Sequence, residues 1–368
     1  MFHGYWAGAA ALGGFIAMLL AVILAKKKFN IPSARKAIHI SGGLLAMLFP
    51  WLGKWNYILP AIVIACFILV ALRLTSRFKK DKEAKASGDF LYDTGSLSSL
   101  GEVVFPMVMA FLTWVTRLDP FLFVTPMAVL ALADSSAALI GSKYGKSNMA
   151  SHGEDKKTQC GSFVFFGVCM IIIPVSALLL TDYDIRKIFI ISLMAAAAAT
   201  IFEMTSSHGM DNLLVPVSVF LMLDSLGDLS YEQILIKFAY VTMIFLVLSF
   251  TRLAKLVSTF SYLQFAMMLS ISLISACWYA AASVTFVSLL ITFEQKIIKK
   301  MNVCIVKPSI MCSCYSIVVL AIYNAGIIPA HPAAVLFFAG NFILIGYTLY
   351  KINDFLPAHH KKQQIMAK

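Results

Sequence analysis

Charged residues are scarce in this sequence: only 13% of its 368 residues are Asp, Glu, Lys or Arg, whereas 60% are hydrophobic. In a soluble globular domain about a quarter of the residues are charged, so we do not expect water to be the main solvent of this chain. The sequence also lacks paired CxxC motifs, and its seven cysteines lie mostly within apolar segments. We therefore expect no cysteine-ligated metal and interpret most of the cysteines as small apolar residues.

The sequence instead contains long apolar segments with few charged residues. They run for about 17 to 25 residues, the length that an α-helix needs to cross a hydrocarbon layer of about 30 Å. We therefore predict an all-α fold, a polytopic transmembrane helical bundle of about thirteen spans. The predicted spans are 5–25, 37–53, 56–74, 101–117, 121–141, 161–180, 186–204, 212–226, 234–250, 258–275, 278–294, 310–327 and 332–350. The second and eighth are short, so each could instead be half-buried or re-entrant.

The meaning of the net charge of +12 depends on where the basic residues lie. Lys and Arg cluster after the first, third, fifth, ninth and eleventh predicted spans and at the end of the chain, whereas the opposite breaks are short and poor in basic residues. Cytoplasmic loops carry such a basic excess, which also meets anionic lipid headgroups. The pattern predicts an outside N-terminus and a cytoplasmic C-terminus, and it argues against nucleic-acid binding.

One carboxylate is predicted to lie at membrane depth. Asp134 falls within the predicted span 121–141, about 10 Å inside its cytoplasmic end, where an ion is costly and seldom needed for structure. The Ser and Ala residues beside it have a simpler explanation, because small residues let helices pack closely. A cation would account for the carboxylate, and Mg²⁺ carried by the phosphates of a nucleotide suits its hard oxygen ligands.

A second polar group enters the predicted span 37–53. Arg35 and His39 are four residues apart and share a helix face, with Lys36 beside them. These residues are interpreted either as a basic interfacial anchor with a histidine satisfied in the bundle, or as phosphate contacts. In the second interpretation Arg35 and Lys36 bind phosphate oxygens, and His39 is a polar partner or a proton acceptor.

A third group precedes the span 161–180 and consists of Lys157, Thr158, Gly161 and Ser162. A lysine, two hydroxyls, backbone N–H groups and a helix N-terminus can converge on phosphate oxygens. The sequence is not a Walker A motif. A solvated basic loop is the alternative interpretation.

The fourth group follows the span 186–204 and comprises Glu203, His208, Asp211 and Asn212. Their carboxylate and amide oxygens are predicted to face the same side as Asp134. A histidine alone is more often interfacial than catalytic. The spans after about residue 235 contain no comparable ionisable residues, so we expect them to have a scaffolding, lipid-groove or oligomerisation role.

These groups lie in segments that resemble the membrane lipid kinases, the family of dolichol kinase, phytol kinase and CTP-dependent diacylglycerol kinase. The resemblance covers roughly residues 30 to 225 and leaves out the last third of the chain. The matching segments are R-K-A-I-H-I-S-G-G at 35–43, G-E-V-V-F-P at 101–106, A-D-S-S-A-A-L-I-G-S-K-Y-G-K at 133–146, K-K-T-Q-C-G-S at 156–162 and E-M-T-S-S-H-G-M-D-N-L-L-V-P at 203–216.

The resemblance implies transfer of the terminal phosphate of a nucleoside triphosphate, typically CTP, to a lipid hydroxyl with Mg²⁺ or another divalent cation. It implies that Asp134 places the metal or activates the hydroxyl, and that His39 and Lys157 complete the catalytic group. Phosphoryl transfer needs mainly positioning and charge neutralisation from a protein, which suits such a set of residues.

The resemblance also implies roles for the remaining residues. Glu203 and Asp211 would serve a metal together with Asp134, and Asn212 and His208 would be further polar residues of the site. The residues expected to bind the nucleotide or its phosphates are Arg35, Lys36, Gly141, Lys143, Lys146, Lys157, Thr158, Gly161 and Ser162.

Two other classes compete with the kinase. Phosphatidate cytidylyltransferases also use CTP and resemble this sequence around Asp134 and Lys157, but of their distal signature only Gly227-Asp228-Leu229 is present. A transporter is the alternative of another class, yet the polar residues cluster on one face and in one half of the chain. A catalytically silent scaffold is disfavoured by Asp134 and Glu203.

We predict four regions: an N-terminal transmembrane anchor (1–29), a lipid-kinase-like catalytic membrane domain (30–230), C-terminal transmembrane helices of unassigned role (231–352) and a basic cytoplasmic tail (353–368). The expected protein is integral to the membrane, with its active site on the cytoplasmic face. Its expected partners are a lipid substrate and a nucleoside triphosphate. The lipid alcohol, the choice of CTP or ATP and a homo-oligomeric state stay open.

Overall fold

The computed structural model describes two compact units, Met1–Val241 and Thr242–Lys368. The described residues are 13–14, 34–78, 100–145, 148–150, 157–206, 209–253, 259–275, 308–329, 332–333, 335–336, 339–341 and 343–344. The boundary between the units falls eleven residues after the predicted division at 230 and 231, within helix α12 (Tyr231–Leu253). All four groups of polar residues singled out above belong to the first unit.

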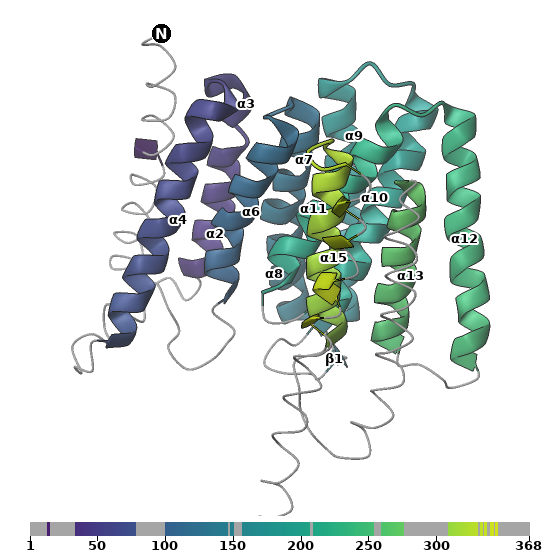
Figure 1. Ribbon diagram of the computed structural model, residues 1–368. Helices are drawn as coiled ribbons and strands as arrows, with labels where there is room; N and C mark the ends of the chain where they lie inside the picture. The colour runs from purple at the N-terminus through teal and green to yellow at the C-terminus, as the bar shows by residue number, and fades with distance from the viewer. Residues whose placement is uncertain are drawn as a thin grey trace, which may run out of the picture. The chain divides into compact units, whose positions relative to one another are not determined.

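The first unit is a bundle of helices that run roughly alongside one another (Figure 1). Before the final helix α12, its described helices are α2 (Ala34–Ala46), α3 (Phe49–Leu52), α4 (Trp55–Phe78), α6 (Leu100–Thr116), α7 (Pro120–Ala128), η2 (Val129–Ala133), α8 (Asp134–Tyr144), α9 (Gln159–Leu180), α10 (Ile185–Thr205) and α11 (Asp211–Gly227). In the second unit, α13 (Thr259–Ile274) packs against α15 (Pro308–Asn324).

Among the described residues, three helices are long and apolar enough to cross a membrane: Pro120–Tyr144, Gln159–Leu180 and Ile185–Thr205. They coincide with the predicted spans 121–141, 161–180 and 186–204 to within a few residues. The helical character predicted for the chain is therefore confirmed in the described residues. The predicted span 278–294, all of 5–25 except residues 13–14, and about half of 332–350 lie outside the described residues.

The predicted span 37–53 is two helices instead of one. The helix α2 ends at Ala46, and α3 begins at Phe49 after a turn at Met47 and Leu48. Pro50 lies in the first turn of α3, where its missing N–H removes no helical hydrogen bond, whereas in the interior of a continuous helix it would. The break lets Pro50 occupy the first turn of a helix, but a proline alone does not require a break, since Pro60 and Pro106 lie inside continuous helices.

The described chain also contains a small sheet, which the all-α prediction missed. Strand β1 (Asn148–Ala150) pairs antiparallel with β2 (Lys157–Thr158), with Asn148 opposite Thr158. The second strand leads directly into α9. This pairing fixes the backbone of Lys157 just before the start of α9. A solvated loop was one of the two interpretations of this segment from the sequence.

Helix α11 is the central helix of the first unit. Every residue from Leu214 to Leu223 is buried, and the helix packs against α10, α7 and α6. A helix that is apolar around its whole circumference has no polar face to turn toward water and is typically buried on all sides. This explains why the sequence of α11 shows no amphipathic pattern. The face of α10 that carries Ala195, Ala196, Ala198 and Ala199 is fully buried, because alanines let neighbouring helices approach closely. The short eighth predicted span is thus one continuous enclosed helix.

The end of α11 at Gly227 is held by the first turn of α10, together with Tyr183 of the loop that precedes it. Lys187 Nζ donates a hydrogen bond to the carbonyl oxygen of Gly227 at 2.5 Å and lies 4.0 Å from the ring centroid of Tyr183. That ring meets Phe121 of α7 edge to face, with centroids 5.9 Å apart. These contacts tie three helices together at the end of the bundle opposite Asp211.

The long helix Pro120–Tyr144 is not a uniform α-helix. Its middle, η2, is a turn of π-helix, and Asp134 is the first residue after it. Four of the five residues of η2 are buried. Such single π turns within α-helices occur frequently at functional sites. This one directly precedes Asp134, the carboxylate that was predicted to lie at membrane depth.

Candidate functional site

The N-terminus of α9 is capped by the side chain of Thr158. Thr158 has extended backbone geometry, and its hydroxyl oxygen accepts a hydrogen bond from the N–H of Gly161 at 3.1 Å. The hydroxyl of Ser162 lies 3.3 Å from the carbonyl oxygen of Thr158. Threonine is a favoured N-cap because its oxygen satisfies an N–H that the helix leaves without a partner. The cap sets the direction in which the chain enters α9 immediately after Lys157.

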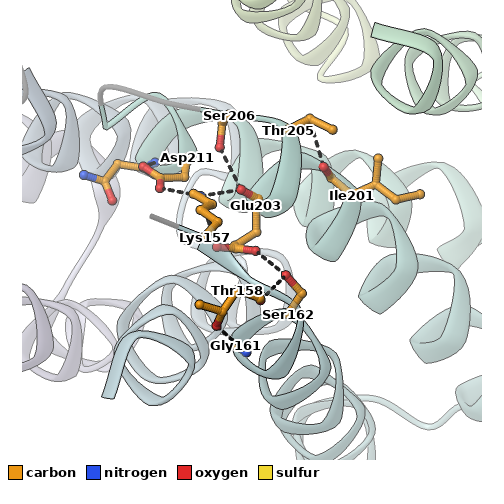
Figure 2. Close-up of polar contacts among 10 residues, drawn as sticks. Lys157, Thr158, Gly161, Ser162, Ile201, Glu203, Thr205, Ser206 and Asp211 are labelled. Atoms are coloured by element: carbon orange, nitrogen blue, oxygen red, sulfur yellow. Dashed lines mark hydrogen bonds and ion pairs between the residues drawn. The ribbon is translucent and has the colours of Figure 1, made fainter. Parts of the chain in front are cut away.

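Lys157 bridges two carboxylates from segments far away in the sequence (Figure 2). Its ammonium nitrogen lies 3.0 Å from Glu203 Oε1 and 3.0 Å from Asp211 Oδ2, and it also donates to the backbone carbonyl of Glu203. The three side chains are only 14%, 10% and 19% exposed, respectively. A largely buried ion pair of this kind joins the start of α9, the end of α10 and the start of α11.

Both carboxylate oxygens of Glu203 have protein partners. One contacts Lys157, and the other accepts a hydrogen bond from the hydroxyl of Ser162 at 3.3 Å. The Ser206 hydroxyl donates to the backbone carbonyl of Glu203 at 3.3 Å. Glu203 therefore serves as a connector between α9 and α10, an arrangement that the sequence alone did not reveal.

The charge on Lys157 follows from its surroundings. Burial by itself lowers the pKa of its ammonium group, but the carboxylates of Asp211, Glu203 and Asp134 together outweigh burial and raise the pKa above its ordinary value. Lys157 is therefore protonated throughout the physiological pH range and cannot act as a general base. The contribution of Asp134 brings the start of α8 into the electrostatic environment of the same ammonium group.

Glycines allow α8 and α9 to cross closely beside this cluster. A Cβ added at Gly141 would lie 2.8 Å from Thr158 Oγ1 and 3.1 Å from the Cα of Gly161. A Cβ added at Gly145 would lie 2.6 Å from Thr158 Cγ2. Gly141 and Gly161, which the sequence assigned to phosphate binding, thus form the contact that brings α8 against the capped start of α9.

Gly141→Ala is expected to lower the free energy of unfolding by about 1–3 kcal/mol, because the added methyl group overpacks a contact that includes backbone. Thermal unfolding in detergent measures the change. Gly167→Ala in α9 is the matched control, since a Cβ there meets nothing within 4 Å. In a helix interior that replacement should stabilise by about 0.5–1 kcal/mol. Equal behaviour of the two variants would contradict the close crossing.

The structure brings together most of the predicted site residues. Lys157, Glu203 and Asp211 are in contact, Asp134 acts on Lys157 electrostatically, and the start of α9 with Gly141 lies beside them. Asn212 is buried, and its backbone N–H donates to Asp211 Oδ1 at 3.0 Å.

Other predicted residues are placed differently or are not described. Lys143 is exposed near the end of α8, with its ammonium 5.2 Å from the ring centroid of Tyr144, and so is not buried with Lys157. Arg35, Lys36 and His39 lie in α2, but only their backbone is described. The predicted residues that lie outside the described residues are Lys146 and His208.

The predicted metal ligands have a different arrangement from a metal site. Among the described residues, no group of three or more His, Cys, Asp or Glu side chains is arranged to hold a metal ion. Glu203 and Asp211 face the Lys157 ammonium instead. The described geometry therefore fits a carboxylate and ammonium cluster and not a protein-held Mg²⁺, which stays a prediction from the sequence.

Comparison of the chain with models of known protein families, with curated proteins and with solved structures finds no match.

Proposed function

We propose that this protein is an integral membrane lipid kinase, which transfers the γ-phosphate of a nucleoside triphosphate, with CTP as the expected donor, to the hydroxyl of a polyprenol, a phytol-like isoprenol or diacylglycerol. The observation that carries the proposal is the largely buried Lys157, held by Glu203 and Asp211 with Asp134 nearby. These ion pairs join three helices, but apolar residues could do the same without the cost of burying charges. Asp134 lies within the predicted span 121–141, where ionisable residues are retained mainly for function.

The membrane part of the proposal has separate support. In the part of the chain that the structure describes, three helices are long and apolar enough to cross a bilayer, and basic residues gather in the breaks after alternate predicted spans. We assign about thirteen spans, an outside N-terminus and a cytoplasmic site from this pattern. Under this orientation the ends of α8 and α10 and the starts of α9 and α11 all face the cytoplasm, where nucleoside triphosphates are available.

The chemistry of phosphoryl transfer suits fixed charges. In the proposed reaction a bond forms between the lipid hydroxyl oxygen and the γ-phosphorus, the bond from that phosphorus to the bridging oxygen breaks, and the nucleoside diphosphate leaves. Asp134 is assigned to orient the hydroxyl and accept its proton, because Lys157 is protonated and cannot do so. Positioning and charge neutralisation supply most of the rate enhancement in this class of reaction.

Lys157 is assigned to charge neutralisation. An ammonium group has three N–H donors, and here its three acceptors are Glu203 Oε1, the Glu203 carbonyl and Asp211 Oδ2. A phosphate oxygen that binds Lys157 must therefore replace one of them. Asp211 is the more exposed of the two carboxylates. We therefore propose that the phosphate oxygen replaces Asp211 Oδ2 as an acceptor of the Lys157 ammonium group.

A transfer assay tests the proposal. The purified protein in detergent is given CTP or ATP labelled at the γ-phosphate, with Mg²⁺ and a panel of long-chain polyprenols, phytol and diacylglycerol, and in a parallel reaction CTP labelled at the α-phosphate with phosphatidate. The expected result is γ-label in one of the lipid alcohols. Transfer of α-label into lipid with release of pyrophosphate would instead identify a cytidylyltransferase. Absence of label from lipid in every reaction would contradict the kinase.

A further inference from the structure

A glycine of α2 contacts the π turn that precedes Asp134. A Cβ added at Gly43 would lie 2.4 Å from the Cβ of Ala131 and 3.5 Å from its Cα. Both residues are buried. Real Cβ atoms do not approach to 2.4 Å, so only glycine fits at position 43 with this spacing. Ala131 belongs to the π turn η2, which ends immediately before Asp134.

A second contact gives the direction of the two chains. The rings of Phe49 and Phe123 stack with centroids 6.3 Å apart. Phe49 follows Gly43 by six residues, whereas Phe123 precedes Ala131 by eight. The two segments therefore run antiparallel. The helix α2 packs mainly on η2 and α7. Continuing the antiparallel register by one turn beyond Gly43 would bring the backbone of His39 level with Asp134 and Ser135.

We infer that Gly43 is a positioning residue, which lets α2 approach the π turn closely enough to place the end of α2 that carries Arg35, Lys36 and His39 beside Asp134. The inference rests on the proposed function for its effect on catalysis, but the placement itself is independent of it. It joins the first group of polar residues to the cluster around Lys157. The contact acts on the reaction only through the position of α2.

The contact between Gly43 and Ala131 is tested by moving the methyl group from position 131 to position 43. Gly43→Ala is expected to reduce kcat for lipid phosphorylation by about 10-fold or more, since a shift of about 1 Å in a catalytic group can cost 100-fold. Adding Ala131→Gly removes the clashing Cβ and leaves the new methyl 3.5 Å from the Cα of residue 131, an ordinary contact. The double variant should recover most of the activity. Gly167→Ala, which meets open space, should leave kcat unchanged.

A cross-link measures the placement without any activity. His39→Cys and Ser135→Cys are introduced together, oxidised in detergent, and the linked peptides are identified by mass spectrometry. We expect a 39–135 disulfide in the chain with Gly43, a loss of it with Gly43→Ala, and its return with Ala131→Gly added. The pair His39→Cys and Leu139→Cys, one turn further along α8, should not link.

The two experiments separate the possible failures. If the 39–135 link does not form, the inference is wrong whatever the kinase assay gives. If Gly43→Ala keeps full kcat in an active enzyme, or the double variant fails to recover, Gly43 does not act by this packing. If the link forms as expected but no lipid is phosphorylated by the unmodified protein, the proposed kinase is wrong and the placement of α2 stands.

Discussion

Asp134→Asn is expected to lower kcat for lipid phosphorylation by at least about 100-fold, the usual contribution of a group that accepts a proton in the transition state. Asparagine has nearly the same shape but carries no negative charge and cannot accept the hydroxyl proton. Asp134 is only partly buried, so the variant should remain folded. The measurement is γ-phosphate transfer at saturating substrate, together with thermal unfolding of the same preparation.

Asp182→Asn is the control for this prediction. Asp182 is an exposed carboxylate in the loop between α9 and α10, at the end of the bundle opposite the cluster. Its replacement should change neither kcat nor the midpoint of thermal unfolding. Full kinase activity in Asp134→Asn would remove Asp134 from the mechanism, and unfolding of that variant would instead assign it a structural role.

Lys157→Met is expected to destabilise the protein by about 3 kcal/mol, because it leaves two largely buried carboxylates without their cation. Removing one partner of such a pair costs far more than removing an exposed charge. The same variant should lose lipid phosphorylation, and thermal unfolding in detergent measures the stability. Lys157→Arg keeps the positive charge and should recover part of the lost stability.

The pH dependence of this effect follows from the raised pKa of Lys157. A lysine whose pKa is higher in the folded state contributes its full stabilisation below the ordinary lysine pKa of about 10.4, and the contribution declines only as the pH rises beyond that value. The stability advantage of the unmodified protein over Lys157→Met should therefore persist at pH values of about 7 to 9.

Lys143→Met provides the matched control for Lys157→Met. Lys143 is also a lysine of the helical ends, but it is exposed beside Tyr144, so its replacement should change stability by less than about 0.5 kcal/mol. Similar stability of Lys157→Met and Lys143→Met would mean that the Lys157 contacts are not maintained in the folded protein.

The positions of the helices were largely predictable from the sequence. Apolar segments bounded by charged or turn-forming residues coincide with helices such as α9 and α10, because the length of an apolar run limits the helix that it can form. The break between α2 and α3 was missed because Pro50 alone does not predict it, since Pro60 and Pro106 lie inside continuous helices. The pairing of β1 with β2 was missed because two very short strands carry no periodic pattern.

The sequence predicted which residues belong to the candidate site but not which of them contact one another. Lys157, Glu203 and Asp211 were each singled out because ionisable groups are rare in apolar segments. Their pairing depends on how α9, α10 and α11 pack, and no local pattern encodes that. The tight fit of Gly43 against Ala131 was missed for the same reason, since a glycine in a helix has several explanations until its neighbour is known.

The π turn between α7 and α8 changes how the two halves of one long helix can be oriented. In an uninterrupted α-helix, positions three or four residues apart form one continuous stripe from end to end. The wider turn at Val129–Ala133 interrupts that stripe, so the residues of α8 are rotated about the helix axis relative to the positions that a continuous α-helix would give them. Helix α7 packs on α11, whereas α8 packs on α9. A helical wheel drawn with 3.6 residues per turn through the whole segment would therefore misplace Asp134 relative to the residues of α7.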